Sequence, residues 1–286
     1  MSNSKKRHLK ILVLSDIHLG TFGCHAKELL SYLKTVKPET VVLNGDIIDI
    51  WQFSKRYWPK SHMKVIRQIT DWMSKGVKVY YITGNHDEML RKFSGFKMGK
   101  FSIQNKVILE LEDGKKAWFF HGDVFDVTMQ HSKWLARLGA TGYDSLILLN
   151  RFVNLISEKV FKKGKLSLSK KIKNSVKTAV SFISNFELTA AEIGIQNGYG
   201  YVVCGHIHQP EIKEIVNSNG SIVYLNSGDW IENLTALEYS SGRWIIYKYN
   251  ELEFSDHFQE VKEEAETGET DLFDTLLKEM NVAALR

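Results

Sequence analysis

The chain has 286 residues, 43% of them apolar, and a formal charge of +5. A chain of this length can bury a sizeable core, and no uninterrupted apolar run reaches the ~18 residues that a membrane-spanning helix requires. Only two cysteines, Cys24 and Cys204, and no charged leader before an apolar stretch argue against a secreted, disulfide-stapled protein. We therefore expect a cytoplasmic protein whose membrane contacts, if any, are peripheral.

The first third of the chain alternates between strand and helix patterns. Buried strands are expected at residues 10–15, 40–44 and 78–83. Two amphipathic helices lie between them, and the second ends at Gly76, a suitable residue for a left-handed position. Their apolar faces are formed by Leu29, Leu30, Leu33 and Val36 in the first helix and by Val65, Ile66, Ile69, Trp72 and Met73 in the second. This alternation predicts parallel strands joined by right-handed crossovers.

The second half of the chain contains shorter strands. Residues 107–111 and 117–120 flank Asp113 and Gly114, which is a hairpin signal. Turn signals at Asn219-Gly220 and Ser241-Gly242 separate the later strands, which suggests a meander. These later strands are expected at 202–204, 211–216, 222–226, 235–239 and 244–249. We expect two packed sheets flanked by helices, an α/β fold.

About eighty residues interrupt this strand pattern. Residues 134–157 and 169–186 have helical composition with apolar stripes. The predicted organisation is a domain at residues 1–254, with a helical lid inserted at about residues 124–197, and an acidic tail at 255–286 of unassigned function.

Five apolar strands end abruptly in polar clusters, in the segments ILVLSDIH, VVLNGDIID, VYYITGNHD, WFFHGD and YVVCGHIH. Strands that stop in this way deliver their side chains to the carboxyl edge of a sheet, where open α/β folds gather their sites. Mixed carboxylate and imidazole ligands suit Mn, Fe or Zn better than Ca or Mg. The clusters therefore predict a centre of two divalent metal ions.

The order DxH, GDxxD, GNHD, HGD and GHxH resembles the calcineurin-like metallophosphoesterases. The resemblance implies a four-layer αββα sandwich of two mixed sheets and two metal ions that share a hydroxide, with Mn as the expected metal and Fe or Zn as alternatives. One ion would take Asp16, His18, Asp46 and His208, and the other Asp46, Asn85, His121 and His206. An isolated histidine is usually an ordinary surface or core residue, but five of the ten histidines fall inside these clusters.

The GNHD motif supplies the expected catalytic residues Asn85, His86 and Asp87. By resemblance, His86 contacts the phosphoryl group and protonates the leaving oxygen, a role that suits an imidazole near neutral pH. Asp87 is expected to orient His86. Asp49 is expected to accept a hydrogen bond from a ligand histidine or a backbone amide.

Within this family the chain is most similar to UDP-2,3-diacylglucosamine hydrolases of lipid A biosynthesis and their paralogues. The resemblance spans about residues 9–250 and rests on the segments HLGTFGC, YWPKSH, GNHDEML, HGDVFD, GHIHQP and NSGDWIENLTAL. It implies cleavage of the pyrophosphate of a lipid-linked sugar nucleotide. The lipid A hydrolase has GNRD in its third motif, whereas this chain has His86, as in the GNHD paralogues. A phosphodiesterase or phosphatase acting on another nucleotide, or on nucleic acid, is the alternative function.

Residues Lys159–Lys177 contain eight lysines and no acidic residue beside an apolar stripe. This pattern suits peripheral docking on an anionic membrane, on the inner face of the cytoplasmic membrane. It equally suits a helix that packs on the domain with its lysines in water. Nucleic acid ranks below the lipid interpretation because no strand with interleaved basic and aromatic residues is evident. We expect no obligate protein partner. A non-catalytic interaction scaffold is the remote alternative, since every ligand position is filled.

Overall fold

The computed structural model describes residues 6–50, 57–125 and 169–254. The chain divides into two compact units, Met1–Lys248 and Tyr249–Arg286. In the second unit the described residues contain a short 3-10 helix, η3 (Glu251–Glu253), capped by the Asn250 side chain. The predicted helix at 134–157 and the acidic tail lie outside the described residues.

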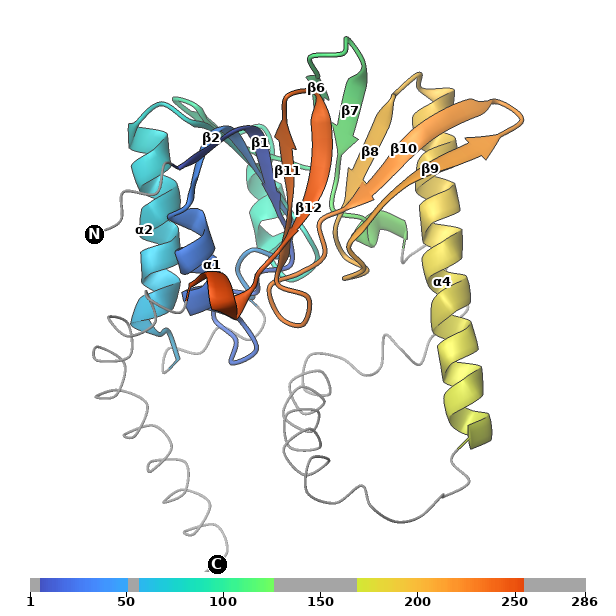
Figure 1. Ribbon diagram of the computed structural model, residues 1–286, viewed down its shortest axis with the longest axis horizontal. Helices are drawn as coiled ribbons and strands as arrows, with labels where there is room; N and C mark the ends of the chain where they lie inside the picture. The colour runs from blue at the N-terminus through green and yellow to red at the C-terminus, as the bar shows by residue number, and fades with distance from the viewer. Residues whose placement is uncertain (1–5, 51–56, 126–168, 255–286) are drawn as a thin grey trace, which may run out of the picture. The chain divides into compact units, whose positions relative to one another are not determined.

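The first unit contains two mixed β-sheets that pack face to face (Figure 1). The seven-stranded sheet has the order β12-β11-β1-β2-β3-β5-β4. Its strands are β1 (Arg7–Leu14), β2 (Val36–Asn44), β3 (Lys78–Ile82), β4 (Lys97–Met98), β5 (Phe101–Gln104), β11 (Thr235–Ser240) and β12 (Arg243–Lys248). Strands β1, β2, β3 and β5 run parallel, and β11 closes on β1 in antiparallel register with Ile11 opposite Tyr239.

The five-stranded sheet has the order β6-β7-β8-β10-β9. Its strands are β6 (Val107–Glu110), β7 (Lys116–Phe119), β8 (Tyr201–Cys204), β9 (Glu211–Asn217) and β10 (Gly220–Asn226). The predicted hairpin of β6 and β7 is present, and β7, β8 and β10 run parallel. The predicted meander is wrong, because β9 and β10 belong to this sheet whereas β11 and β12 cross to the other one.

Apolar side chains fill the space between the two sheets. Every other residue of β1 and β2 points inward, and Val13, Val42, Phe119 and Val203 are almost fully buried in one cluster that draws on both sheets. The two sheets therefore share one core, and the strand ends of both meet at a common edge.

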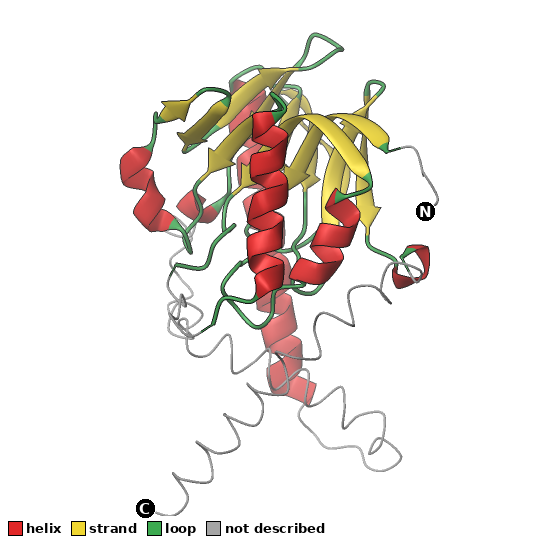
Figure 2. Ribbon diagram, turned by 90° about the vertical axis from the view of Figure 1, so that its left-hand side faces the viewer, coloured by secondary structure: helices red, strands yellow, loops and turns green. Residues whose placement is uncertain are grey.

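Helices cover the outer faces of the two sheets (Figure 2). On the seven-stranded sheet lie α1 (Ala26–Leu33) and α2 (Lys60–Ser74), and Gly76 after α2 has the expected positive φ of 84°. Val36 was expected on the first helix but begins β2, because the chain turns at Lys34 and Thr35. The result is the expected four-layer αββα sandwich.

The helix α4 (Ser169–Gln196) covers the five-stranded sheet and is ten residues longer than predicted. Its residues Phe186, Ala190 and Ala191 are buried against Val202 and Tyr224 of that sheet. The described C-terminal part of α4, which belongs to the expected lid, therefore packs as a layer of the sandwich. Among the described residues, no helix combines the length and apolar character needed to cross a membrane.

Candidate metal centre

The predicted ligands stand out by their backbone conformation. Seven non-glycine residues of the described part have a positive φ, and five of them are predicted ligands: Asp16, His18, Asp46, His206 and His208, with φ between 52° and 67°. A left-handed backbone is costly for a residue with a Cβ and gathers at functional sites. At these residues the backbone turns sharply just after a strand ends. The turns after β1 and β2 are held together by hydrogen bonds from the N–H groups of Asp16 and His18 to the carbonyls of Gly45 and Asp46.

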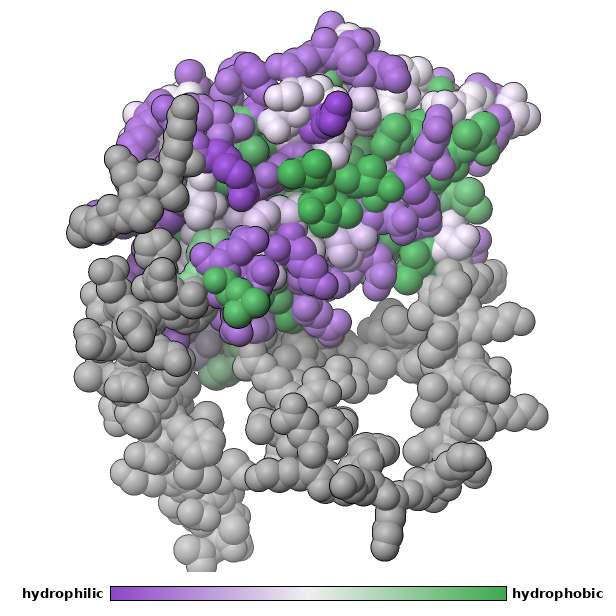
Figure 3. All heavy atoms as spheres, in the orientation of Figure 1, coloured by the Kyte–Doolittle hydropathy of each residue, from purple (hydrophilic) through white to green (hydrophobic). Residues whose placement is uncertain are grey.

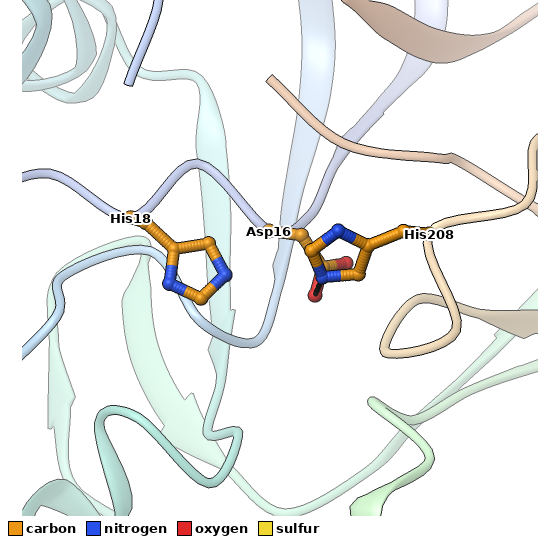
Figure 4. Close-up of side chains that lie close together, drawn as sticks. All are labelled: Asp16, His18 and His208. Carbon is orange, nitrogen blue, oxygen red and sulfur yellow. Dashed lines mark ion pairs between the residues drawn. The ribbon is translucent and has the colours of Figure 1, made fainter. Parts of the chain in front are cut away.

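A first group of possible ligands consists of Asp16, His18 and His208, whose ligand atoms all lie within 4.8 Å of one another. Figure 4 shows the three side chains close together, with Asp16 and His18 on the turn after β1 and His208 on the segment after β8. The Oδ1 atom of Asp16 lies 3.2 Å from Nε2 of His208, and its Oδ2 atom accepts a hydrogen bond from the N–H of His206. One carboxylate thus connects the ends of β1 and β8.

A second group consists of Asp46, His121 and His206, and a third of His18, Asp46 and His86. Asp46 belongs to both, and it is almost fully buried. Its Oδ2 atom lies 3.2 Å from Nε2 of His121 and 4.0 Å from Nε2 of His18. Asp46 therefore lies between two groups of possible ligand atoms.

The surroundings of His121 indicate that this centre needs a positive charge. Its Nδ1 lies 2.9 Å from the carbonyl oxygen of Asn44, so Nδ1 carries a proton and donates it. In the neutral ring, Nε2 then presents a lone pair to the Asp46 carboxylate, which also can only accept. Nε2 of His121 and Oδ1 of Asp16 are buried atoms with no hydrogen-bond partner in the described residues. Such opposed acceptors suit a cation between them.

The pKa values of the buried imidazoles and carboxylates also indicate that the centre needs a positive charge. Burial lowers the pKa of His121, but the carboxylates of Asp46 and Asp16 outweigh burial and raise it well above its usual value. Burial also lowers the pKa of His208, and Asp16 reverses this and raises it to about 9. Burial raises the pKa of Asp16, but His208 and His121 lower it to about 2. The carboxylates thus remain ionised and draw positive charge to the imidazoles, a role that divalent cations can take over.

In the GNHD motif, the side chains of His86 and Asp87 have different partners. The Nδ1 atom of His86 donates to Oδ2 of Asp49 at 2.8 Å, and the same oxygen lies 3.4 Å from Nδ1 of His18. Burial lowers the pKa of His86, but the hydrogen bond to Asp49 and the charge of Asp46 outweigh burial and raise it. Asn85 is half-buried and lies in the loop three residues after the end of β3. Asp49 therefore has the orienting position that was expected of Asp87.

The expectation for Asp87 needs correction. Its carboxylate is fully buried and accepts hydrogen bonds from the N–H groups of Gly84 and Ile47 and from the hydroxyl of Tyr81. These bonds use the carboxylate to join the loops after β2 and β3. These hydrogen bonds make Asp87 a structural support of the site, whereas Asp49 holds Nδ1 of His86.

Sequence reasoning missed Asp229. This buried residue accepts backbone hydrogen bonds from Ile231 and Glu232, and its Oδ2 lies 3.8 Å from Nδ1 of His208. A signal for it existed, because β10 is another apolar strand that ends in a polar run, Asn226-Ser-Gly-Asp229. Asp229 lies on the far side of His208 from Asp16.

Two mixed sheets between helices carry, at their common edge, a cluster of carboxylates and imidazoles that could hold metal ions. The profile of the calcineurin-like phosphoesterases matches residues 9–210, and the chain belongs to this family.

Curated proteins similar to this chain are named as hydrolases. The chain is 24% identical to a UDP-2,3-diacylglucosamine hydrolase of Aliivibrio fischeri over 253 residues, which cover 84% of this chain and 98% of the relative. It is 26% identical to a protein of the same name from Histophilus somni, over 81% of this chain and 97% of the relative. Among solved structures, an archaeal phosphodiesterase is similar over 84% of this chain and 99% of its own, with 14% identity and a TM-score of 0.40.

Proposed function

We propose that the protein cleaves the pyrophosphate of a lipid-linked sugar nucleotide, as a UDP-2,3-diacylglucosamine diphosphatase that releases UMP. Relatives named for this activity match the chain over nearly their whole length. The observation that carries the hydrolytic part is the position of Asp46 between two sets of ligand atoms. A pyrophosphate is a phosphoric anhydride, so its hydrolysis needs charge neutralisation and an activated water at one phosphorus atom.

In this proposal Asp16, His18, Asp46 and His208 hold one divalent ion, and Asp46, Asn85, His121 and His206 hold the other. Manganese is the proposed metal, because mixed oxygen and nitrogen ligands suit it. When bound, two such ions neutralise the phosphate oxygens and make a water molecule nucleophilic at neutral pH. The protein contributes the fixed positions of the ligands, which its strand ends and left-handed residues hold in place.

The chain's own groups act around this centre. The carboxylate of Asp49 accepts a hydrogen bond from Nδ1–H of His86 and thereby fixes the orientation of the ring. The other ring nitrogen, Nε2, is then the atom from which a proton would pass to the leaving phosphate oxygen. The carbonyl of Asn44 fixes the ring of His121 in the same way, and the backbone N–H groups of His86 and His206 hold the oxygens of Asp46 and Asp16.

The residue at position 86 favours a second candidate substrate. His86 stands where the lipid A hydrolase motif has arginine, and a histidine titrates whereas an arginine remains charged. A phosphodiesterase acting on another nucleotide is therefore the alternative substrate assignment for the same centre.

The deciding experiment is incubation of the full chain with UDP-2,3-diacylglucosamine and Mn²⁺, with detection of UMP. The matched control is the Asp16→Asn, Asp46→Asn double variant. We expect UMP from the wild type and none from the variant. Turnover of bis(p-nitrophenyl) phosphate without any UMP would reject the lipid substrate and keep the hydrolase. No metal-dependent turnover of either compound would reject the hydrolase as well.

We also propose that the protein works in the cytoplasm, with a peripheral contact to the membrane that carries its substrate. The lysines of residues 159–177, which were expected to make this contact, lie outside the described residues and side chains.

A further inference from the structure

The chain crosses from one sheet to the other beside the candidate metal centre. β10 ends at Asn226 in the five-stranded sheet, and β11 begins at Thr235 in the seven-stranded sheet. The end of this crossing, from Asp229 to Leu234, is here called the 229–234 turn. The segment between β10 and β11 loops below the strands in Figure 1, and the same part of the molecule in Figure 3 carries many hydrophilic residues (purple). Contacts between this turn and the proposed ligands therefore connect the ligands to both sheets.

The 229–234 turn has a fixed shape. Oδ1 of the fully buried Asp229 accepts hydrogen bonds from the backbone N–H groups of residues 231–233. The turn ends at Leu234, whose φ of 52° is left-handed and costly for a bulky residue. Such a conformation persists only where the surrounding contacts hold it, and it gathers at functional sites. The strain at Leu234 thus indicates that the contacts of the turn matter to the centre.

The amide of Asn233 holds the backbone of a proposed ligand. Its Nδ2 donates to the carbonyl oxygen of His208 at 2.8 Å and to Oδ2 of Asp229. A carbonyl and a carboxylate can only accept, so the NH₂ group must face them, and each of its two hydrogens has a partner. His208 has a left-handed φ of 53°, so Asn233 holds the carbonyl of a strained residue.

The ring of His208 lies between two carboxylates. Its Nε2 is 3.2 Å from Oδ1 of Asp16, and its Nδ1 is 3.8 Å from Oδ2 of Asp229. The turn also holds the backbone of Asp16, because the N–H of the buried Trp230 donates to the carbonyl of Asp16. The turn therefore contacts two residues that belong to the same group of possible ligands, one from each sheet.

We propose that Asn233 and Asp229 are positioning residues, which hold His208 in place for the ion that it shares with Asp16. Asn233 fixes the backbone of His208, and Asp229 fixes the amide of Asn233 and faces the ring of His208. This inference rests on the proposed function, which assigns Asp16 and His208 to one of two divalent ions. It adds that the 229–234 turn serves one ion of the pair.

The proposed ligands of the other ion have supports elsewhere. The carbonyl of Asn44 holds Nδ1 of His121, and the N–H of His86 donates to Oδ1 of Asp46. These contacts come from the loops and strands around β2 and β3, which the 229–234 turn does not include. Weakening the turn should therefore affect one ion and spare the other.

The test is calorimetric titration of the metal-free full chain with Mn²⁺, together with electron paramagnetic resonance of the bound ions. Wild type should bind two ions that give a spin-coupled signal. In Asn233→Ala, one ion should bind about 10- to 100-fold more weakly, and the coupled signal should give way to that of isolated Mn²⁺. Asp229→Asn keeps the Oδ1 acceptor and should change binding in the same direction.

The matched control is Asn197→Ala. The amide of Asn197 also donates to a backbone carbonyl at 2.8 Å, that of Ile193 near the end of α4. This variant loses the same kind of hydrogen bond away from the centre, so it should bind both ions as the wild type does. Thermal unfolding of the metal-free proteins checks that each variant folds, and Asp229→Asn carries the comparison if Asn233→Ala does not.

The outcomes separate this inference from the proposed function. If the wild type binds a coupled pair and both turn variants bind it equally well, the inference is overturned and the hydrolase assignment remains. Equal weakening of both ions would also overturn the inference, because it would show a general loosening of the fold. A wild-type protein that binds no pair of ions would overturn the proposed function and the inference together.

Discussion

Asp49 joins two imidazoles that have different tasks. Its Oδ2 atom lies 2.8 Å from Nδ1 of His86 and 3.4 Å from Nδ1 of His18. One carboxylate oxygen thus orients both a proposed ligand and the proposed proton donor. A change at Asp49 should disturb metal binding and the chemical step together.

We predict that Asp49→Asn lowers kcat about 10- to 100-fold and weakens the apparent affinity for Mn²⁺, because the neutral amide holds both imidazoles less firmly. The measurement is turnover of bis(p-nitrophenyl) phosphate over a range of Mn²⁺ concentrations. Asp71→Asn, on the exposed face of α2, is the control and should change neither value. Equal kinetics in the Asp49 variant would contradict the orienting role.

His62 is a buried histidine outside the metal centre. Its Nδ1 accepts a hydrogen bond from the N–H of Gly20 at 2.9 Å, and burial lowers its pKa to about 4. Since the pKa in the unfolded chain is near 6.5, the unfolded chain binds the proton more strongly between these values. The neutral ring stabilises the fold fully above about pH 6.5, and this contribution is lost as the pH falls toward 4.

We predict that acidification from pH 7.5 to pH 4.5 destabilises the wild type more than it destabilises His62→Asn. The asparagine can still accept from Gly20 but does not titrate. The difference in unfolding free energy should reach at most about 3 kcal/mol, at about 1.4 kcal/mol per pKa unit. Urea unfolding of both proteins at several pH values measures it. Parallel pH curves would show that His62 does not contribute.

At the scale of elements, the tight turn after β2 requires a glycine. Gly45 has a φ of 84°, and a Cβ there would lie 2.3 Å from the ring of His121. Gly114, in the hairpin between β6 and β7, has a similar φ of 76° and open space around it. The two positions share the backbone strain of a left-handed residue and differ in the contact with a proposed ligand.

We predict that Gly45→Ala lowers kcat by about 10²-fold or more, because it displaces His121 by a large fraction of an ångström. Gly114→Ala should retain full activity and lose only about 1–2 kcal/mol of stability from left-handed strain. Activity assays and urea unfolding of the two variants give this comparison. If both variants were equally active, the close packing of β2 against His121 would have no functional role.

The sequence predicted elements well where the signal was local. Continuous apolar strands that stop at a polar residue placed the ends of β1, β2, β3, β7 and β8, because the pattern and the strand are the same residues. The sheet to which a strand belongs is not local. The pairing of β11 with β1 joins residues more than 200 positions apart, so turn signals alone suggested one meander.

The helix α4 shows another limit of prediction from the sequence. Gly194 lies inside it, and glycine is an unfavourable helix residue by intrinsic propensity. The structure gives its reason, since a Cβ on Gly194 would lie 2.4 Å from Cδ1 of Ile222 on β10. Tertiary packing therefore requires the residue that propensity disfavours. Asp49 lies beside the predicted ligand His18, as expected, but it also orients His86 in place of Asp87, and this depends on side-chain directions that motif spacing does not contain.

At the scale of the whole molecule, the centre connects both sheets. Asp16 and Asp46 follow strands of the seven-stranded sheet, whereas His121, His206 and His208 follow strands of the five-stranded sheet. Ions held by both sets should therefore stabilise the sandwich as a unit.

We predict that Mn²⁺ raises the stability of the fold by about 2.7 kcal/mol when it is present at 100 times its dissociation constant. For a chain of this size, the change corresponds to a rise in Tm of several degrees. Thermal unfolding with and without Mn²⁺, and after chelation, measures the effect. The Asp16→Asn, Asp46→Asn variant should show no rise, and an equal rise in this variant would place the bound metal elsewhere.

The wide separation of the ligands along the chain also affects biosynthesis. A ribosome releases the amino-terminal strands first, and β1 then has β2 beside it while its other edge waits for β11, at Thr235–Ser240. The last two imidazoles of the centre, His206 and His208, also emerge late. A nascent polypeptide therefore carries an open strand edge and an incomplete set of the proposed ligands for most of its translation, and capture of metal at the proposed centre would follow chain synthesis.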